Sequence, residues 1–240
     1  MAAPLTTDPS ISFIIPVLND RDALATLLPQ LQRYREKGHE VLIVDGGSND
    51  GSVTAARQQV DRILITGTGR GRQMNLGAEN ARHGILNFLH ADSIVPEEYD
   101  ACIQAALENP RHYWGRFDVT LDEPEFIFRI IGFMMNLRSR CSGVATGDQG
   151  IFVRKDFFDE AGGFKSIPLM EDIALSKALR KKSWPVCIKT RITTSARRWK
   201  TRGVVRTIWL MWVLRLKYFL GVNPERLAKK YYPAREDSLS

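Results

Sequence analysis

Apolar runs alternate with helix-like patterns through the first 92 residues of the chain. The apolar runs lie at 10–17, 40–45, 62–66 and 84–89. Each is short, rich in branched side chains and bounded by turn-forming residues, which indicates a buried strand. Between the runs, apolar residues recur with the period of a helix. This alternation predicts a mainly parallel sheet with helices on both faces.

The helix expected after the first run carries its own boundary signals. Asn19 or Asp20 can cap its first turn, and Gly38 can end it. Pro29 lies inside the apolar pattern and predicts either a kink or a later start of the helix.

The second half of the chain is less regular. Helical patterns cover 97–109, 126–138 and 168–182, with a short one after 155, and strand patterns cover 114–121 and 149–154. No internal repeat, low-complexity tract or domain boundary is evident in the 240 residues. We therefore expect one mixed α/β domain with a helical extension at its C-terminal end.

The composition, with 44% hydrophobic and 25% charged residues, is typical of a soluble globular protein. Cys102, Cys141 and Cys187 are far apart and lack metal-ligand spacing, which argues against a structural zinc site. The first ten residues have neither a basic start nor an apolar run, so they do not resemble a signal peptide. A reducing cytoplasm is the expected compartment.

The net charge of +7 is unevenly distributed. Residues 177–235 hold 17 Lys and Arg and one acid, a net +16, which leaves −9 for the rest of the chain. Such asymmetry predicts an anionic partner, either nucleic acid, lipid headgroups or a phosphate-bearing substrate.

Two apolar segments, 126–137 and 207–214, are too short or too interrupted by charge to span a bilayer. Both can lie on a membrane surface, with Trp209 and Trp212 at the headgroups. The alternative, which the frequency of buried helices favours, is that both are buried amphipathic helices.

Polar residues and glycines follow each of the first four expected strands. They lie at 16–20, 45–50, 67–72 and 90–92. Ligands bind beyond the carboxyl ends of the strands in such sheets, so these segments predict one site. Arg72 stands where a dinucleotide fingerprint needs glycine, and the chain has no P-loop motif.

Each candidate in these segments also has an ordinary structural interpretation. Asp45 either forms a turn or accepts hydrogen bonds from a nucleoside. Asp92, two residues after His90, either caps the helix near 97 or binds Mg²⁺ or Mn²⁺ together with a diphosphate. His90 is equally explained as a structural histidine.

Two further clusters follow in the second half. Glu171 and Asp172 either stabilise a helix N-terminus through its dipole or supply a general base whose pKa is raised by apolar neighbours. Arg197, Arg198 and Trp199 are either a solvated basic face or a site for phosphate and a ring.

Taken in order, eight blocks of the chain resemble family 2 glycosyltransferases, enzymes of the GT-A fold that use nucleotide-diphosphate sugars. The blocks are SFIIPVLND, EVLIVDGGSNDGS, GRGRQMNLGAENA, NFLHADS, GDQGIFVRKDFF, GGF, PLMEDIALSKAL and TSARRW. FLHAD and PLMED are similar to a small bacterial subgroup linked to arsenosugar biosynthesis.

This resemblance implies roles for individual residues. On the donor side, the nucleoside pocket, the base contact and the nucleotide contacts would come from Pro16, Leu18, Asp20, Asp45, Arg72 and Asn75. The HAD block, with Ala91 at its centre, stands where the family shows Asp-x-Asp. Asp92 would bind the metal, Mg²⁺ or Mn²⁺, and His90 replaces the first aspartate. Asp172, beside Glu171, would be the base, and Arg197, Arg198 and Trp199 match a Gln-x-x-Arg-Trp block that has Ser195 in place of Gln.

The implied function is inverting hexosyl transfer from a nucleotide-diphosphate sugar, with UDP the expected nucleotide, to a small-molecule or lipid-linked acceptor. Peripheral contact with the inner face of the cell membrane is compatible with it, and no nucleic acid is expected. Within a single domain over 1–240, 10–110 would bind the donor, 111–200 would hold the acceptor and catalytic groups, and 201–240 would be a basic helical extension. The alternatives are a nucleotidyltransferase that makes nucleotide sugars, although PVLNDRD lacks its Gly-rich basic loop, and a non-catalytic basic nucleotide- or nucleic-acid-binding protein.

Overall fold

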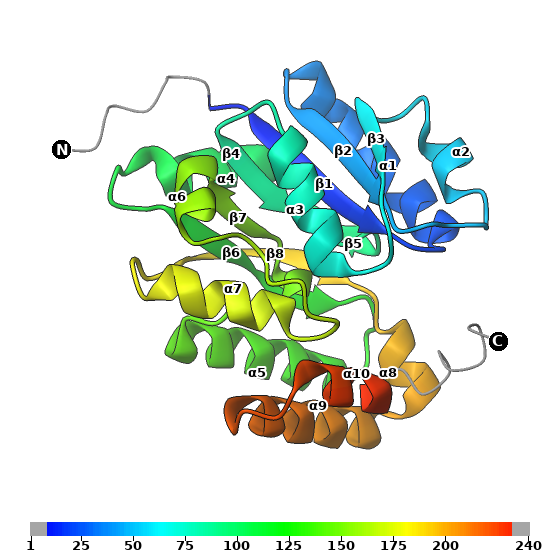
Figure 1. The fold of residues 1–240 in the computed structure, drawn as a ribbon, viewed down its shortest axis with the longest axis vertical. Coiled ribbons are helices and arrows are strands. Elements are labelled where there is room, and N and C mark those ends of the chain that lie inside the picture. The colour runs from blue at the N-terminus through cyan, green and yellow to red at the C-terminus, as the bar shows by residue number, and fades with distance from the viewer. Residues whose placement is uncertain (1–8, 232–240) are drawn as a thin grey trace.

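A single eight-stranded sheet organises the molecule in the computed structural model, which describes residues 9–231 apart from the side chains of Arg198 and Arg202 (Figure 1). Its strands are β1 (Ile11–Val17), β2 (Glu40–Asp45), β3 (Arg62–Ile65), β4 (Ile85–Phe88), β5 (Ser93–Ile94), β6 (Trp114–Leu121), β7 (Ile151–Arg154) and β8 (Val186–Thr194). They lie in the order β3-β2-β1-β4-β7-β6-β8-β5.

The sheet is mixed and mainly parallel. Strands β3, β2, β1 and β4 are parallel neighbours, and β6 pairs in parallel with β8. Strand β7 is antiparallel to both β4 and β6, and β5 is antiparallel to β8. The predicted fold class is confirmed, and the carboxyl ends of β1, β2 and β4 lie at one edge.

Helices cover both faces of the sheet. Side chains of β1 alternate between the two faces, so Phe13 and Ile15 pack in one cluster and Ile14 in the other. The first cluster is covered by α1 (Arg21–Glu36), α2 (Ser52–Ala56) and α4 (Tyr99–Glu108). The second is covered by α3 (Arg70–Asn80), α6 (Lys155–Glu160) and α7 (Glu171–Arg180).

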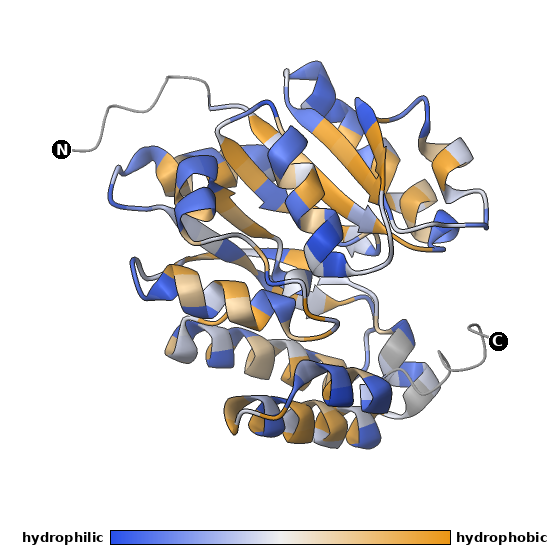
Figure 2. Cartoon of the chain, viewed as in Figure 1, coloured by the Kyte–Doolittle hydropathy of each residue, from blue (hydrophilic) through white to orange (hydrophobic). Residues whose placement is uncertain are grey.

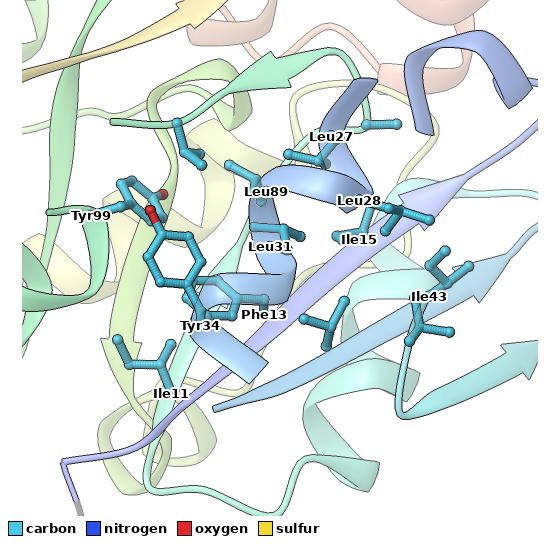
Figure 3. Close-up of a cluster of buried hydrophobic side chains, with 14 of the residues drawn as sticks. Ile11, Phe13, Ile15, Leu27, Leu28, Leu31, Tyr34, Ile43, Leu89 and Tyr99 are labelled. Carbon is cyan, nitrogen blue, oxygen red and sulfur yellow. The ribbon is translucent and has the colours of Figure 1, made fainter. Parts of the chain in front are cut away.

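Aromatic rings hold α1 and α4 against the sheet beneath them (Figure 3). The ring centroids of Phe13 and Tyr34 are 5.5 Å apart, and those of Phe13 and Tyr99 are 6.1 Å apart. All three side chains are fully buried, so each stabilises the fold by a few kcal/mol, about 1.5–3 for a residue such as Phe.

The first helix shows which of its boundary signals the fold uses. Helix α1 begins at Arg21, so the later start that Pro29 allowed is wrong. Asp20 stands at the N-cap, but its side chain does not cap the helix. Asp50, from the loop after β2, accepts a 3.0 Å hydrogen bond from the Arg21 N–H instead. This bond joins the loops that follow β1 and β2.

A third layer lies below the sheet in Figure 1 and consists of α5 (Phe126–Ser142), α8 (Arg197–Arg202), α9 (Val204–Phe219) and α10 (Pro224–Tyr231). A short 3-10 turn, η1 (Gly147–Gln149), leads from α5 to β7. The interpretation of 126–137 and 207–214 as buried helices is wrong for their outer faces, where residues such as Phe133 and Trp209 are exposed. Helix α9 lies at the edge of the molecule and still carries many hydrophobic residues (Figure 2). None of the helices within residues 9–231 has the length and hydrophobicity needed to cross a bilayer.

Candidate active site

A cavity of about 1090 Å³ opens between the sheet and the third helical layer. Its polar wall comes from the segment after β4, from η1, from the first turn of α7 and from the end of β8. Its apolar wall comes from α5 and α9. Segments from four distant parts of the chain therefore meet around one space.

The segment after β4 brings His90 and Asp92 to this wall. Helix α4 begins at Tyr99 with Glu98 as its N-cap, so Asp92 is not the cap of that helix. Ala91, between the two, is buried in the core under α1. The alternation of side chains thus turns Ala91 inward and leaves its two polar neighbours on the cavity.

The acid pair begins α7 and faces the same cavity. One oxygen of Asp172 accepts a 3.0 Å hydrogen bond from the Gly147 N–H, and the other accepts a 2.7 Å bond from the Ile173 N–H. Met170, just before the pair, has φ 69° and is buried. A side chain in this left-handed region costs about 1–3 kcal/mol, strain of a kind that concentrates at functional sites.

Burial raises the pKa of both carboxyl groups. The pKa of Glu171, only 7% exposed, rises to about 7 because of burial and then the charge of Asp172, against the attraction of Arg70. The pKa of Asp172 is also raised by burial, although its two backbone donors favour the ionised form. Raised carboxyl pKa values in a cavity are typical of general bases.

Two arginines lie opposite the acids on the same cavity. Arg138 of α5 and Arg215 of α9 both line it, and the Nε atom of each is buried without a hydrogen-bond partner. Burial lowers the pKa of Arg138 to about 10 and also lowers that of Arg215, while Asp148 and Asp172 oppose the shift. Arg138 therefore remains charged at neutral pH.

The expected nucleoside residues gather beside this cavity, at the ends of β1 and β2, and do not line it. One oxygen of Asp45 accepts bonds of 2.9 Å from the Gly47 and Ser48 N–H groups, so the residue does form the turn. Its other oxygen is buried and has no partner. An orphaned buried carboxylate oxygen is costly, and a donor from a ligand would satisfy it.

Gln73 joins the strand ends that carry Pro16, Leu18 and Asp45. Its amide nitrogen donates 2.8 Å hydrogen bonds to the carbonyls of Val17 and Val44. Pro16 and Leu18 are partly exposed beside this link. The pattern of α3 gave no signal for this buried glutamine, because its role depends on the neighbouring strands.

Arg72 and Asn75 differ in position. Arg72 lies near the loop after β3, where a Cβ on Gly67 would be 3.0 Å from its guanidinium. Asn75 bonds the Phe164 carbonyl at 2.8 Å and the Phe164 N–H at 2.9 Å. The amide of Asn75 therefore holds the loop after α6, and its contact with a nucleotide stays a prediction.

The members of the basic cluster, Arg197, Arg198 and Trp199, also differ in position. Arg197 lines the cavity and pairs with Asp20 at 3.3 Å, which joins α8 to the end of β1. Trp199 lines the cavity while packing against the cluster around Phe128. The side chain of Arg198 lies outside the described part of the chain.

Sequence reasoning missed several cavity residues, which are Arg70, Arg138, Gly147, Asp148 and Arg215. Arg70, Gly147 and Asp148 lie inside two of the eight blocks, and the signal for Arg138 and Arg215 was a charge directly after each apolar segment, 126–137 and 207–214. Because α5 and α9 come together only in the folded chain, that signal did not indicate a shared site.

The donor set fits a metal shared with a substrate. Within residues 9–231, no group of three His, Cys, Asp or Glu side chains is placed to hold a metal ion. Mg²⁺ commonly takes one or two protein carboxylates and completes its shell with phosphate oxygens and water. Asp92, on the cavity wall beside His90, suits this class of site.

Gly147 offers a direct test of the packing at the site. A Cβ at this position would lie 2.3 Å from His90 Nε2, and the backbone of Gly147 also holds Asp172. We expect Gly147→Ala to displace the ring and lower turnover by roughly 10- to 100-fold, as a small misplacement of catalytic groups does. Gly84→Ala is the control, because a Cβ there meets nothing within 4 Å. Equal turnover in both variants would contradict this packing.

Glu171 should destabilise the protein as the pH rises. The folded state holds its proton up to about pH 7, whereas the unfolded chain loses it near 4.5, so stability falls across that interval. We expect Glu171→Gln to raise the free energy of unfolding by about 1–3 kcal/mol above pH 7. Urea denaturation at pH 4.5 should show little difference. A gain of equal size at both pH values would rule out the ionisation as its cause.

Comparison with known proteins gives a family and a fold. The family model described as glycosyl transferase family 2 matches residues 12–166. The glycosyltransferase AglE of Haloferax volcanii is 36% identical over 96 residues, an alignment that covers 36% of this chain and 32% of the relative.

Among solved structures, the mannosyltransferase PcManGT of Pyrobaculum calidifontis, in complex with GDP-Man and Mn²⁺, matches with a TM-score of 0.63 and 17% identity over 87% of this chain and 62% of its own. TarS 1–349 of S. aureus, in complex with UDP-GlcNAc, matches with a TM-score of 0.63 and 16% identity over 78% of this chain and 58% of its own. The chain thus spans about a third of the curated relative and about three-fifths of these structures. At such identities the structural likeness shows a shared fold.

Proposed function

The chain belongs to glycosyl transferase family 2, and from this premise we propose that it moves a sugar from a nucleotide-diphosphate sugar to an acceptor hydroxyl with inversion. The observation that carries the proposal is the meeting of Asp92 and Asp172 on one cavity. One carboxylate suits the diphosphate end of a donor, and the other suits the hydroxyl of an acceptor.

The donor would lie across the edge where β1, β2 and β4 end. The free oxygen of Asp45 would accept a hydrogen bond from the base, with Pro16, Leu18 and Arg72 beside it. The solved relatives hold UDP-GlcNAc and GDP-Man, so both uridine and guanosine donors need testing. We propose a UDP-hexose as the first donor to test.

Proton transfer would fall to Asp172. Its carboxylate removes the acceptor hydroxyl proton as that oxygen attacks the anomeric carbon, and the bond to the diphosphate breaks on the opposite face. The Gly147 and Ile173 N–H groups hold the carboxylate in place. Burial, and then the charge of Asp148, raise the pKa of Asp172 and so its affinity for that proton.

Asp92, with His90 beside it, would hold the Mg²⁺ or Mn²⁺ ion. When bound, that ion supplies Lewis-acid stabilisation of charge on the diphosphate. Arg197 and Arg70 line the same wall and would add positive charge there.

The division of labour along the chain follows from this arrangement. We propose that 10–110 binds the donor, that 111–200 supplies the catalytic and acceptor groups, and that the basic helices after 201 complete the acceptor side of a single domain. We also propose that the chain acts in arsenosugar biosynthesis, because FLHAD and PLMED resemble the subgroup linked to that pathway.

A panel of UDP- and GDP-sugars with Mg²⁺ or Mn²⁺ tests the proposal. We expect a thermal shift with at least one donor and release of its nucleoside diphosphate. Release of pyrophosphate from a nucleoside triphosphate mixed with a sugar 1-phosphate would indicate a nucleotidyltransferase. Salt-dependent oligonucleotide binding without donor turnover would indicate a binding protein. No response to any donor would overturn the proposal.

A further inference from the structure

Exposed hydrophobic side chains gather on two helices of the third layer. Of the 15 large hydrophobic side chains that are exposed within the described residues, 11 lie on α5 and α9. Phe133 is 63% exposed and Trp209 is 72% exposed. Single exposed apolar residues are common on proteins, but a concentration of this kind marks a site of interaction.

Both helices are fixed in orientation by their inner faces. The Asn136 amide of α5 bonds the N–H and carbonyl of Val119 in β6 at 2.8 and 2.9 Å. Leu214 of α9 is fully buried in a cluster with Met170 and Ile173 at the start of α7. The outer faces are therefore presented to solvent by well-anchored helices.

The charge of these helices favours a lipid surface over a neutral partner. Neither α5 nor α9 contains an acidic residue. Three exposed basic residues lie on them, namely Arg129, Arg206 and Lys217, while Arg138 and Arg215 line the cavity and Arg140 pairs with Asp118. Basic side chains beside exposed tryptophan and phenylalanine are the composition of helices that lie in the headgroup region of an anionic bilayer.

The cavity connects this surface to the acid pair. Ile127, Ile130 and Met134 of α5 form part of its wall, together with Met211 and Trp212 of α9. The same cavity reaches Asp172. Because the expected nucleoside residues lie outside it, this apolar space belongs to the acceptor side.

Two guanidinium groups line the same cavity as the apolar side chains and the acids. Arg138 and Arg215 have buried Nε atoms that no described residue satisfies. A buried donor left unpaired costs about 1–3 kcal/mol, more when it is charged, and an anionic ligand group would remove that cost. A phosphate is the anion that guanidinium groups bind best, because the two geometries match.

We propose that the acceptor is a membrane lipid with an anionic headgroup. Its chain lies between α5 and α9, its phosphate pairs with Arg138 and Arg215, and its hydroxyl reaches Asp172. The outer faces of the two helices hold the enzyme on the anionic surface that supplies this lipid. This inference rests on the proposed function and names its acceptor class.

Binding to vesicles tests the surface without any donor. The full chain is sedimented with vesicles of phosphatidylcholine alone or mixed with phosphatidylglycerol. We expect binding to the mixed vesicles that weakens with salt, and a loss of about ten-fold or more in Phe133→Ser/Trp209→Ser. Neither residue lines the cavity. Ile65→Ser is the matched control, since Ile65 is 70% exposed on β3 and should bind as the parent does.

Three results would overturn the membrane surface. The first is no binding to the mixed vesicles, and the second is equal binding by the parent and by Phe133→Ser/Trp209→Ser. The third is a parent protein that binds no vesicles but forms a dimer in solution, while the same variant is a monomer. The last result would assign the two helices to a contact between copies of the chain.

Nucleoside diphosphate release tests the headgroup site. We expect mixed vesicles to stimulate release several-fold. Arg215→Gln should lose that stimulation while still sedimenting with vesicles. Lys217→Gln changes a residue of the same helix outside the cavity wall, and its stimulation, divided by the amount of protein bound to vesicles, should equal that of the parent. Equal stimulation in Arg215→Gln would overturn the headgroup site. Stimulation by inorganic phosphate alone would assign it to a free phosphate and overturn the lipid.

These arms separate the inference from the function on which it rests. Vesicle binding without turnover of any donor would overturn the glycosyl transfer. Donor turnover that is indifferent to vesicles would overturn the lipid acceptor and leave the transfer standing.

Discussion

Asp172→Asn should lower turnover by roughly 10³-fold or more while leaving nucleotide binding unchanged, since a general base contributes on the order of 10²–10⁴ to the rate. The amide retains the shape of the carboxylate and can still accept the Ile173 N–H bond, now 2.7 Å. It cannot accept the hydroxyl proton. Steady-state nucleotide release measures the first effect, and calorimetric titration with the nucleoside diphosphate measures the second.

Asp156→Asn provides a closely matched control. Asp156 also stands in the first turn of a helix and also accepts a 2.7 Å bond from the next N–H, but it is exposed on α6 and does not line the cavity. Its variant should turn over normally. Normal turnover in Asp172→Asn would show that Asp172 is not the general base. Loss of nucleotide binding along with turnover would show instead that the acid supports the donor site.

Asp92→Asn should weaken the metal-dependent part of nucleotide binding. An amide oxygen carries no net charge, so the site loses its carboxylate for a hard cation. We expect at least the roughly ten-fold loss in affinity that removal of even an outer-shell partner costs a metal site. Titration of UDP and GDP with and without Mn²⁺ measures the difference.

The metal-free affinity is the internal reference for Asp92→Asn and should not change. Asp159→Asn, an exposed acid on α6, is the matched control for loss of a charge. If Mn²⁺ strengthens nucleotide binding equally in the parent and in Asp92→Asn, the metal is held elsewhere.

The first half of the fold could be predicted because its signals are local. Strands β1, β2, β3 and β4 are short apolar runs, and the polar segments after them meet at one edge because parallel strands point the same way. The sequence also predicts that Asp172 lies at the start of a helix. Helix α7 begins at Glu171, one residue before it.

The second half of the fold depends on contacts that no local pattern reveals. Strand β8, Val186–Thr194, opens with three apolar residues and continues with mainly polar and charged ones, so its sequence gives no clear strand pattern. The role of Asn75 depends on Phe164, far along the chain, and the link between Arg197 and Asp20 spans most of it. Only the folded chain shows that these pairs meet.

Helices α5 and α9 show how a base rate can mislead. The frequency of buried apolar helices favours an interior position over a membrane surface, yet each helix buries only part of its surface and exposes the rest. Basic residues such as Arg129, Arg206 and Lys217 are the better indicator, because an unpaired charge is costly inside a core.

The stereochemistry of donor hydrolysis tests the central claim most directly. With water as the acceptor, proton NMR can record which anomer of the sugar appears first, before the anomers equilibrate. A base at Asp172 and direct displacement predict the anomer opposite to that of the donor, and no such product from Asp172→Asn. First appearance of the donor's own anomer would contradict the account.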